Sequence, residues 1–411
     1  MLKKYFCDMH IHIGATSEGK PVKITASKNL IFENIVRESL TRKGMDLISI
    51  VDCASPGVLK DIKKMISEGE LHPLQDGGLL HRDRLTFIPA SEIETAEKNG
   101  GVSHHISYFP DIKSITEFSR VMRQYITNIE LSSQRASLTA SELLSVTKAT
   151  GGVLIPSHAF TPHKSLYGNA GRRMVEVFGD NAENIPAVEL GLSADTSIAD
   201  RLDELKNLSF LSNSDAHSIP KIAREYTIIQ MKRPNFREFI LALHRNADRK
   251  ILANVGMDPR LGRYHRSFCL KCEKVQQAPP PVFKCQYCGN ENKSKKDMIT
   301  GVLDRITEIG DFNEPVHPEH RPPYHYQIPL AFVPGLSDRI MNYLLQRFGS
   351  EMAILNIATD KEIHAALPPD IARNLIDARN GKLDITAGGG GKHGKIEENK
   401  ESGYEELTFG F

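Results

Sequence analysis

The stretch KYFCDMHIHIGAT, residues 4–16, places an aspartate and two histidines inside a hydrophobic run that has the character of a β-strand. The three residues are Asp8, His10 and His12, in the order D-x-H-x-H. Side chains two positions apart on a strand point to the same face, so His10 and His12 can bind one metal ion. Taken alone, the pattern fits a metal site and an ordinary buried strand equally well.

Strand-like and helix-like segments alternate through residues 1–250. The strand-like segments include DLISIVDC (46–53), LTFIPASEIE (85–94), VLIPSH (153–158) and LSFLSNSD (208–215). Repeated βα units predict an α/β sheet or barrel, in which the carboxyl ends of the strands meet at one edge.

Potential metal ligands stand at the ends of several of these strands. Buried charges are costly unless they are paired or metal-bound, so five such strands favour a metal centre over core packing. Imidazole and carboxylate donors suit zinc, manganese or iron, and a bridging carboxylate such as Glu92 suits a two-metal centre. Besides Asp8, His10 and His12, the candidates are Asp52, Glu92, His104, His105, His158, Asp215 and His217.

Length and composition bound the class of protein. A chain of 411 residues predicts two or three domains, and 40% apolar residues suffice for a core. The net charge of +1 excludes a global attraction to nucleic acid or membrane, so any such contact must be local. No apolar run reaches the length of a membrane span, and the N-terminus lacks the apolar core of a signal peptide. These features predict a cytoplasmic protein with no membrane partner.

Four of the six cysteines form the motif C-x2-C-x12-C-x2-C. Two such pairs in a cytosolic chain indicate a closed, structural zinc site rather than disulfides. The surrounding residues 259–300 hold nine Lys/Arg against three Asp/Glu, which fits either a solvated surface or a track for the DNA phosphate backbone. The predicted zinc ligands are Cys269, Cys272, Cys285 and Cys288, and the basic residues singled out for DNA are Lys293, Lys295 and Lys296.

The chain after the cysteines has a different character. Residues 301–386 are expected to be mostly helical, and FVPGLSDRIMNYLLQRFG is similar to a helix-hairpin-helix unit, although a plain αα-hairpin fits as well. Tyr324 and Tyr326, in HPEHRPPYHYQIP, could stack on an extruded base or belong to an ordered linker. Residues 387–411 have the composition of a flexible tail.

The order D-x-H-x-H, SEIE, a strand histidine, SH and DAH resembles the PHP (polymerase and histidinol phosphatase) superfamily. The resemblance implies a distorted βα barrel, over residues 1–258, with two or three divalent ions (Zn, Mg or Mn). One ion would lie among His10, His12, Glu92 and Asp215, a second among Glu92, His104 and His158, and His217 would contribute to a third.

Two positions leave alternatives within that pattern. Many superfamily members have T-D-H where this chain has VDC, so the third ion is either missing or held by Asp52 or the Cys53 thiolate. His104 is favoured over His105 because HHISYF then aligns with the superfamily strand, but His105 remains open.

A second resemblance spans nearly the whole chain. HAFTP, VELGLSADT, SNSDAHS, the cysteine motif, HPEHRPPYHYQIPL and VPGLSDRIMNYLLQRFG together are similar to the endonuclease Q family. This implies a metal-dependent DNA repair endonuclease that cuts 5′ to deaminated bases (hypoxanthine, uracil, xanthine) or abasic sites in double- or single-stranded DNA. Asp215 and Glu92 would be the catalytic carboxylates, and Arg224 is a candidate for offsetting phosphoryl charge.

Two other functions are compatible with parts of the sequence. A phosphatase of the PHP superfamily would act on a small phosphoester and would not need residues 263–386. A non-catalytic zinc-ribbon protein would bind DNA without cleaving it. The strand-end ligands argue against the second alternative, and the last third of the chain argues against the first.

Overall fold

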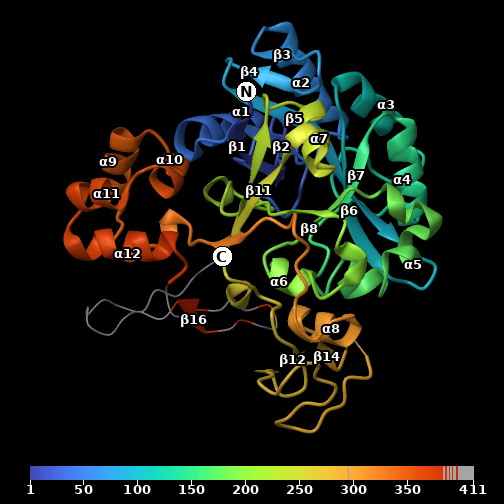
Figure 1. Ribbon diagram of the computed structural model, residues 1–411. Coiled ribbons are helices and arrows are strands. Elements are labelled where there is room, and N and C mark those ends of the chain that lie inside the picture. The colour runs from blue at the N-terminus through green and yellow to red at the C-terminus, as the bar shows by residue number, and fades with distance from the viewer. Residues whose placement is uncertain (295, 383–384, 387, 389–390, 392–394, 397–411) are drawn as a thin grey trace.

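A curled ten-stranded sheet forms the centre of the computed structural model, which describes residues 1–294, 296–382, 385–386, 388, 391 and 395–396 (Figure 1). The hydrogen-bonded order is β15-β11-β10-β1-β2-β5-β4-β3, and β6 and β7 continue from β5. A separate parallel pair, β8 and β9, lies between β7 and β11 and completes a distorted barrel. The strands are β1 (Lys3–Ile11), β2 (Leu47–Ile50), β3 (Leu71–Pro73), β4 (Leu79–His81), β5 (Leu85–Ala96), β6 (Val102–Tyr108), β7 (Val153–Pro156), β8 (Ala187–Glu189), β9 (Ser209–Leu211), β10 (Tyr226–Met231), β11 (Lys250–Gly256) and β15 (Tyr324–Tyr326).

The predicted α/β barrel is confirmed, but the expectation that each ligand ends a parallel strand is wrong for Glu92 and His104. Strands β1, β2 and β5 are parallel, whereas β6 is antiparallel to both of its neighbours, β5 and β7. Glu92 therefore lies in the second half of β5, and His104 lies near the start of β6. The β5–β6 hairpin still brings both residues to the same edge, because one strand runs toward it and the other leaves it.

Helices pack around the barrel and connect its strands. Helix α2 begins at Pro56, because proline suits the first position of a helix, and α4 begins with a capping box of Thr139 and Glu142. The helices of this region are α1 (Phe32–Arg37), α2 (Pro56–Ser67), α3 (Ile112–Met122), α4 (Ala140–Ala149), α5 (Met174–Phe178), α6 (Thr196–Ala199) and α7 (Phe236–Leu243). The apolar residues of the strands and of these helices form the main core, with no exposed surface at positions such as Phe87, Phe118 and Phe210.

The cysteine-rich segment forms a small unit of its own below the barrel in Figure 1. Its sheet contains β12 (Phe268–Cys269), β13 (Lys274–Val275) and β14 (Met298–Ile299), in the order β13-β12-β14. Few apolar residues are buried here, and two of the four that make up its core cluster are Cys269 and Cys285. Helix α8 (Val302–Ile309) follows and packs against the barrel near α6.

The C-terminal region is helical, as expected, but it begins with a strand that belongs to the barrel. Strand β15 pairs in parallel with β11, so Tyr324 and Tyr326 lie at the edge of the main sheet and not in a linker. The prolines around PPYHYQIP hid this strand, because proline is confined to strand ends and edges. Four helices follow: α9 (Asp338–Phe348), α10 (Glu351–Asn356), α11 (Asp360–Ala366) and α12 (Pro369–Arg379).

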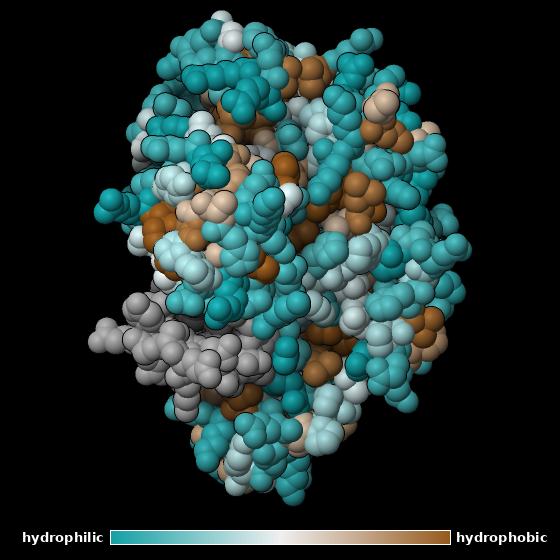
Figure 2. Space-filling view, turned by 60° about the vertical axis from the view of Figure 1, so that its left-hand side comes forward, coloured by the Kyte–Doolittle hydropathy of each residue, from teal (hydrophilic) through white to brown (hydrophobic). Residues whose placement is uncertain are grey.

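The predicted flexible tail, residues 387–411, falls almost entirely outside the described residues. Of its described residues, Gly388 and Gly391 donate backbone hydrogen bonds to the carbonyls of Arg260 and Arg263. Residues of β17 (Lys395–Ile396) pair with β16 (Ile385–Thr386). Among the described residues, no helix combines the length and apolar character that crossing a membrane requires. The face seen in Figure 2 is mostly hydrophilic, with hydrophobic residues in small separate patches.

Candidate metal centre

Four predicted ligands from β1, from β5 and from the segments that follow β1 and β9 converge in one cluster. Both His10 Nε2 and His12 Nε2 lie 3.4 Å from one oxygen of Asp215 and 3.6 Å from oxygens of Glu92. The two Nε2 atoms are 3.3 Å apart. Two donors that each lie about 2.1 Å from one tetrahedral ion are separated by about 3.4 Å, so these atoms fit a common divalent ion.

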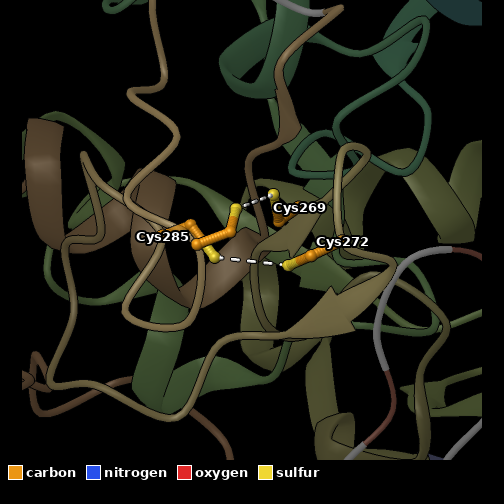
Figure 3. Close-up of side chains that lie close together, drawn as sticks. Cys269, Cys272 and Cys285 are labelled. Atoms are coloured by element: carbon orange, nitrogen blue, oxygen red, sulfur yellow. Dashed lines mark hydrogen bonds between the residues drawn. The ribbon is translucent and has the colours of Figure 1, made fainter.

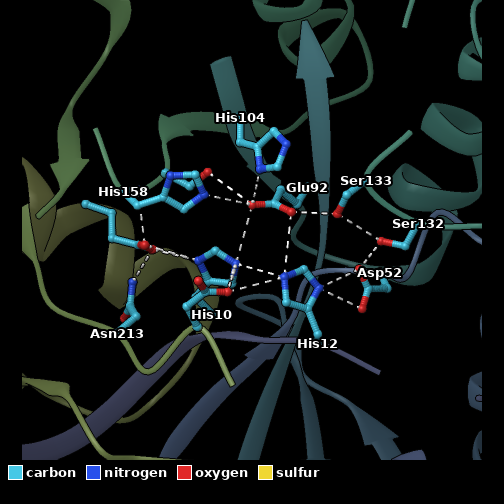
Figure 4. Close-up of polar contacts among 12 residues, drawn as sticks. His10, His12, Asp52, Glu92, His104, Ser132, Ser133, His158 and Asn213 are labelled. Atoms are coloured by element: carbon cyan, nitrogen blue, oxygen red, sulfur yellow. Dashed lines mark hydrogen bonds and ion pairs between the residues drawn. The ribbon is translucent and has the colours of Figure 1, made fainter. Parts of the chain in front are cut away.

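A second group forms on the other side of Glu92 (Figure 4). Oε1 of Glu92 lies 3.1 Å from His104 Nδ1 and 3.4 Å from His158 Nε2, so this carboxylate contacts ligands of both groups. His105 points to the opposite face of β6, where Nε2 bonds Ser103 Oγ at 2.8 Å and the ring packs on Phe178. Of the two neighbouring histidines, the structure thus brings His104 to the cluster.

A third group unites His12, Asp215 and His217. The rings of His12 and His217 are 4.4 Å apart, and His217 Nδ1 lies 3.5 Å from Asp215. Cys53 does not join this group, because its fully buried thiol donates to the carbonyl of Ile50 within the main core. Because the thiol faces the core, the geometry does not support the alternative of a Cys53 thiolate ligand; burial also raises the pKa of this thiol.

The candidate ligands are oriented by an outer ring of acceptors. Metal-binding histidines usually place their second nitrogen on a carboxylate or another polar group, which fixes the ring and its tautomer. Here His10 Nδ1 lies 2.9 Å from Glu189, and His12 Nδ1 lies 3.0 Å from Asp52. On the other side, His104 Nε2 contacts Glu94 at 3.3 Å, and His158 Nδ1 contacts Thr161 Oγ1 at 3.3 Å. The arrangement is the one expected of ligands rather than of histidines that serve packing.

The charge of the cluster also calls for cations. Glu92, Asp52 and Glu189 are almost completely buried, and a buried carboxylate is costly without positive charge nearby. Burial by itself would raise the pKa of Glu92, but the charges of His104 and Lys23 hold it well below its usual range. For His10, burial is outweighed by Glu189, Asp215 and Glu92, which raise its pKa to about 10. Donor type, spacing and charge therefore fit two or three divalent ions.

Two of the candidate ligands have an unusual backbone. His158 has φ of +30° and Asp215 has φ of +46°, a region that non-glycine residues seldom adopt. Both residues follow a strand directly or closely, where the chain must turn sharply to keep the side chain over the barrel. Arg224 secures one of these turns, because its guanidinium donates to the carbonyl of Ser214 at 2.8 Å. The carboxylate of Asp8 secures it further by accepting from the backbone N–H of Ser214 and Ala223.

Arg224 and Asp8 thus lie beneath the site and hold the Asp215 loop. The cation that faces the cluster is instead Lys23, whose Nζ lies 3.2 Å from Glu92 Oε2 and bonds Ser133 Oγ. Sequence reasoning missed Lys23, Ser133 and Glu189. Glu189 is the last residue of β8, so the search for ligand-type residues at strand ends that found His158 could have found it. Lys23 and Ser133 come from loops that carry no ligand motif.

A cleft of about 320 Å³ opens over the cluster. The candidate ligands His12, Glu92, His104, His158, Asp215 and His217 line it. Its other lining residues are Lys23, Ile24, Thr25, Ser132, Ser133, Gln134 and Lys164. A phosphate group would reach the ligand cluster through this opening.

The four cysteines of the motif meet in one place (Figure 3). Cys269 Sγ lies 3.7 Å from Cys288 Sγ, and Cys272 Sγ lies 3.5 Å from Cys285 Sγ. Four thiolates about 2.3 Å from a tetrahedral ion would be spaced by nearly these distances. All four can serve as ligands of one closed site.

The residues predicted to contact DNA lie at some distance from one another in the fold. Lys293 is exposed and pairs with Glu291 at 2.8 Å, Lys296 is exposed, and Lys295 lies outside the described residues. The hydroxyl of Tyr326 donates to Asp195 at 2.7 Å, and that of Tyr324 donates to the Met257 carbonyl at 3.4 Å. Both tyrosines are half-buried, and their role in binding DNA stays a prediction.

Comparisons with known proteins extend over the same regions. No protein-family model matches the chain. The uncharacterized protein YqxK of Bacillus subtilis strain 168 is 41% identical over 398 residues, which cover 96% of this chain and all of that protein. The uncharacterized protein MJ0043 of Methanocaldococcus jannaschii is 33% identical over 301 residues, 67% of this chain and 35% of that protein.

Two solved structures share the complete architecture. The lesion-specific endonuclease PfuEndoQ from Pyrococcus furiosus has a TM-score of 0.82 and is 31% identical, over 97% of this chain and 96% of that one. Endonuclease Q in complex with a 27-mer duplex substrate, with an abasic lesion at the active site, has a TM-score of 0.81 and is also 31% identical. That likeness covers 97% of this chain and 98% of the other. The barrel, the cysteine unit and the C-terminal helices are all included.

Proposed function

The chain belongs to the endonuclease Q family and is a lesion-specific DNA repair endonuclease, and from this premise we propose which residues cut which DNA. The proposed substrates are duplexes or single strands with hypoxanthine, uracil, xanthine or an abasic site, cut on the 5′ side of the lesion. The observation that carries the proposal is that Glu92 contacts candidate ligands of two groups and lines an open cleft together with them.

We assign the ion-binding residues by these groups. His10, His12, Glu92 and Asp215 would hold one ion, while Glu92, His104 and His158 would hold a second. His12, Asp215 and His217 would hold a third, which replaces the expectation that Asp52 or Cys53 supplies a ligand. When bound, such ions polarise a scissile phosphodiester and lower the pKa of a water molecule that attacks phosphorus.

The chain itself supplies orientation and charge. Glu92 and Asp215 are the proposed catalytic carboxylates, because each contacts at least two of the candidate histidines. Lys23 is placed to offset negative charge on the phosphoryl oxygens, the role first considered for Arg224. Arg224 acts instead as a positioning residue, since it binds the backbone of the loop that carries Asp215.

The rest of the chain would bind the DNA around the lesion. We propose a structural zinc ion at Cys269, Cys272, Cys285 and Cys288, which would supply much of the folding energy of a unit with so small a core. The basic residues of this unit would follow the phosphate backbone and contribute affinity without reading sequence. In this proposal, residues 1–258 cut the DNA, whereas residues 259–300 and 301–386 bind it. Strand β15, from the last of these segments, pairs with β11 of the barrel.

The two alternative functions, a phosphatase and a non-catalytic DNA-binding protein, are not favoured. The likeness to endonuclease Q includes the last third of the chain, which a small-molecule phosphatase would not need. The ligand cluster, in turn, has no purpose in a protein that only binds DNA.

A panel of end-labelled duplexes tests the proposal. Each duplex carries one lesion and is incubated with the protein and Mg²⁺ or Mn²⁺, with undamaged DNA and an aryl phosphate as negative controls. Asp215→Ala should abolish cleavage and retain DNA binding, whereas Asp370→Ala, a control at a side chain that is 86% exposed, should cut normally. Cleavage by Asp215→Ala at a near wild-type rate would show that the assigned centre is wrong.

A further inference from the structure

An isoleucine stands exposed at the mouth of the catalytic cleft. Ile24 lines the opening together with Lys23 and Thr25, yet 67% of its surface is accessible to solvent. Single exposed apolar residues are common on proteins and need no explanation in general. Ile24 differs in its position, because it lines the same cleft as the proposed ion-binding residues.

The backbone around Ile24 is firmly held. The N–H of Ala26 donates to the carbonyl of Lys23 at 3.0 Å, which closes a turn with Ile24 and Thr25 at its tip. On one side of this turn, Lys23 donates from its backbone to Ile13, and its side chain binds Glu92. On the other side, the N–H of Ser27 donates to the carbonyl of His217 at 2.8 Å. The turn is therefore fixed to the two segments that carry the ligands, and its tip keeps a set distance from them.

The charges around the turn favour DNA as its partner. Residues 20–28, KPVKITASK, contain three lysines and no acidic residue. Lys20 and Lys28 are exposed, and Lys23 is directed into the cleft. An apolar tip between cations suits a contact in which the lysines meet phosphates and the isoleucine meets the faces of bases.

Enzymes that act at a damaged base commonly turn the nucleotide out of the helix, and proteins that distort DNA often insert an apolar side chain between bases. We propose that Ile24 is the wedge that enters the base stack next to the lesion and supports the extruded nucleotide. The inference rests on the proposed action on deaminated bases in duplex DNA. It assigns the turn at residues 23–26 a role in lesion recognition that the ion-binding residues do not have.

The test compares one lesion in two settings. Hypoxanthine is placed in a fully paired duplex or in a bubble of unpaired bases, where extrusion is already nearly complete and a wedge has little to add. Single-turnover cleavage is measured for the wild type, Ile24→Ala, Ile24→Leu and Val175→Ala. Val175, on α5 of the barrel, is the control because it is a branched apolar residue that is 58% exposed and lies outside both the cleft lining and the segments proposed to bind DNA.

Ile24→Ala should cut the paired duplex about tenfold more slowly, since it removes most of the apolar surface that would be buried between bases. On the bubble, the same variant should stay within about twofold of the wild type. Ile24→Leu and Val175→Ala should cut both substrates at close to the wild-type rate. A second readout uses 2-aminopurine next to the lesion in the Asp215→Ala background, where adding Ile24→Ala should lower the rise in fluorescence on binding.

If Ile24→Ala lowers the cleavage rate equally on the duplex and the bubble, or on neither, the proposal that Ile24 is a wedge is overturned. An unchanged 2-aminopurine signal would do the same. Failure of the proposed function has a different signature, because the wild type would then cut neither substrate.

Discussion

Lys23→Met tests whether the charge at the cleft wall acts on the reaction. Lys23 is 11% exposed at its side chain, and its ammonium group lies 3.2 Å from Glu92. A phosphoryl oxygen bound over this cluster would lie about 4 Å from Nζ, and a unit charge pair at that distance interacts by about 4 kcal/mol at an effective dielectric constant of about 20. Such an energy corresponds to about a thousandfold in rate.

The expected loss is smaller than this limit. Part of the attraction already exists in the ground state, so only the charge that develops in the transition state contributes to kcat. We therefore expect Lys23→Met to lower the single-turnover rate about a hundredfold, in the range seen when one charge-stabilising donor is removed. Lys23→Arg keeps the charge and should recover at least a tenth of the wild-type rate.

The assay combines cleavage of a lesion duplex with two further measurements. Metal content and affinity for the lesion duplex are determined for each variant, and Lys113→Met on α3 of the barrel is the exposed control. Normal metal content with a slow reaction would support a direct effect on the phosphoryl group. If Lys23→Met loses its metal, the lysine serves to position Glu92, and a rate within threefold of the wild type would refute the reasoning altogether.

Three other predictions follow from separate parts of the molecule. Cys285→Ser should release one zinc ion per chain and loosen the cysteine unit, while cleavage ions stay bound; elemental analysis that finds the zinc unchanged would contradict this. Replacing Lys293, Lys295 and Lys296 with alanine should weaken binding to damaged and undamaged duplexes alike and make the affinity less dependent on salt concentration. An unchanged salt dependence would mean that these lysines are only solvated. Changing Tyr324 and Tyr326 should instead erase the preference for damaged DNA. Burial raises the pKa of Glu225 to about 8, so the folded state binds this proton more tightly than the unfolded state. The free energy of unfolding should therefore fall as pH rises from about 4.5 to 8, and Glu225→Gln should flatten that fall in urea titrations at several pH values.

The metal centre was accessible from the sequence to the extent that its residues belong to strand motifs. His10 and His12 share a face because of the period of two, and a histidine or aspartate after an apolar strand is visible in IPSH and SNSD. The sequence could not reveal the direction of β6, since a strand of either direction has the same pattern. It also could not place Lys23, which is brought to Glu92 by a loop whose course depends on tertiary contacts.

Two further errors have physical causes. Cys53 matched a ligand position in the motif, but the side chain turns into the core, where a thiol behaves as a small apolar group. The linker alternative for Tyr324 and Tyr326 is wrong, because an edge strand tolerates the surrounding prolines on its outer side, whereas their contact with an extruded base stays a prediction.

The left-handed backbone at Asp215 has a consequence for stability. An L-amino acid in this region costs about 1–2 kcal/mol, and glycine escapes most of that cost because it lacks a Cβ atom. Asp215→Gly should thus be more stable than Asp215→Ala by about 1 kcal/mol, the reverse of the usual order of these two residues, although neither variant is expected to cut DNA. The folded state would then be more stable with glycine than with alanine at position 215, so a functional side chain at this position comes with backbone strain.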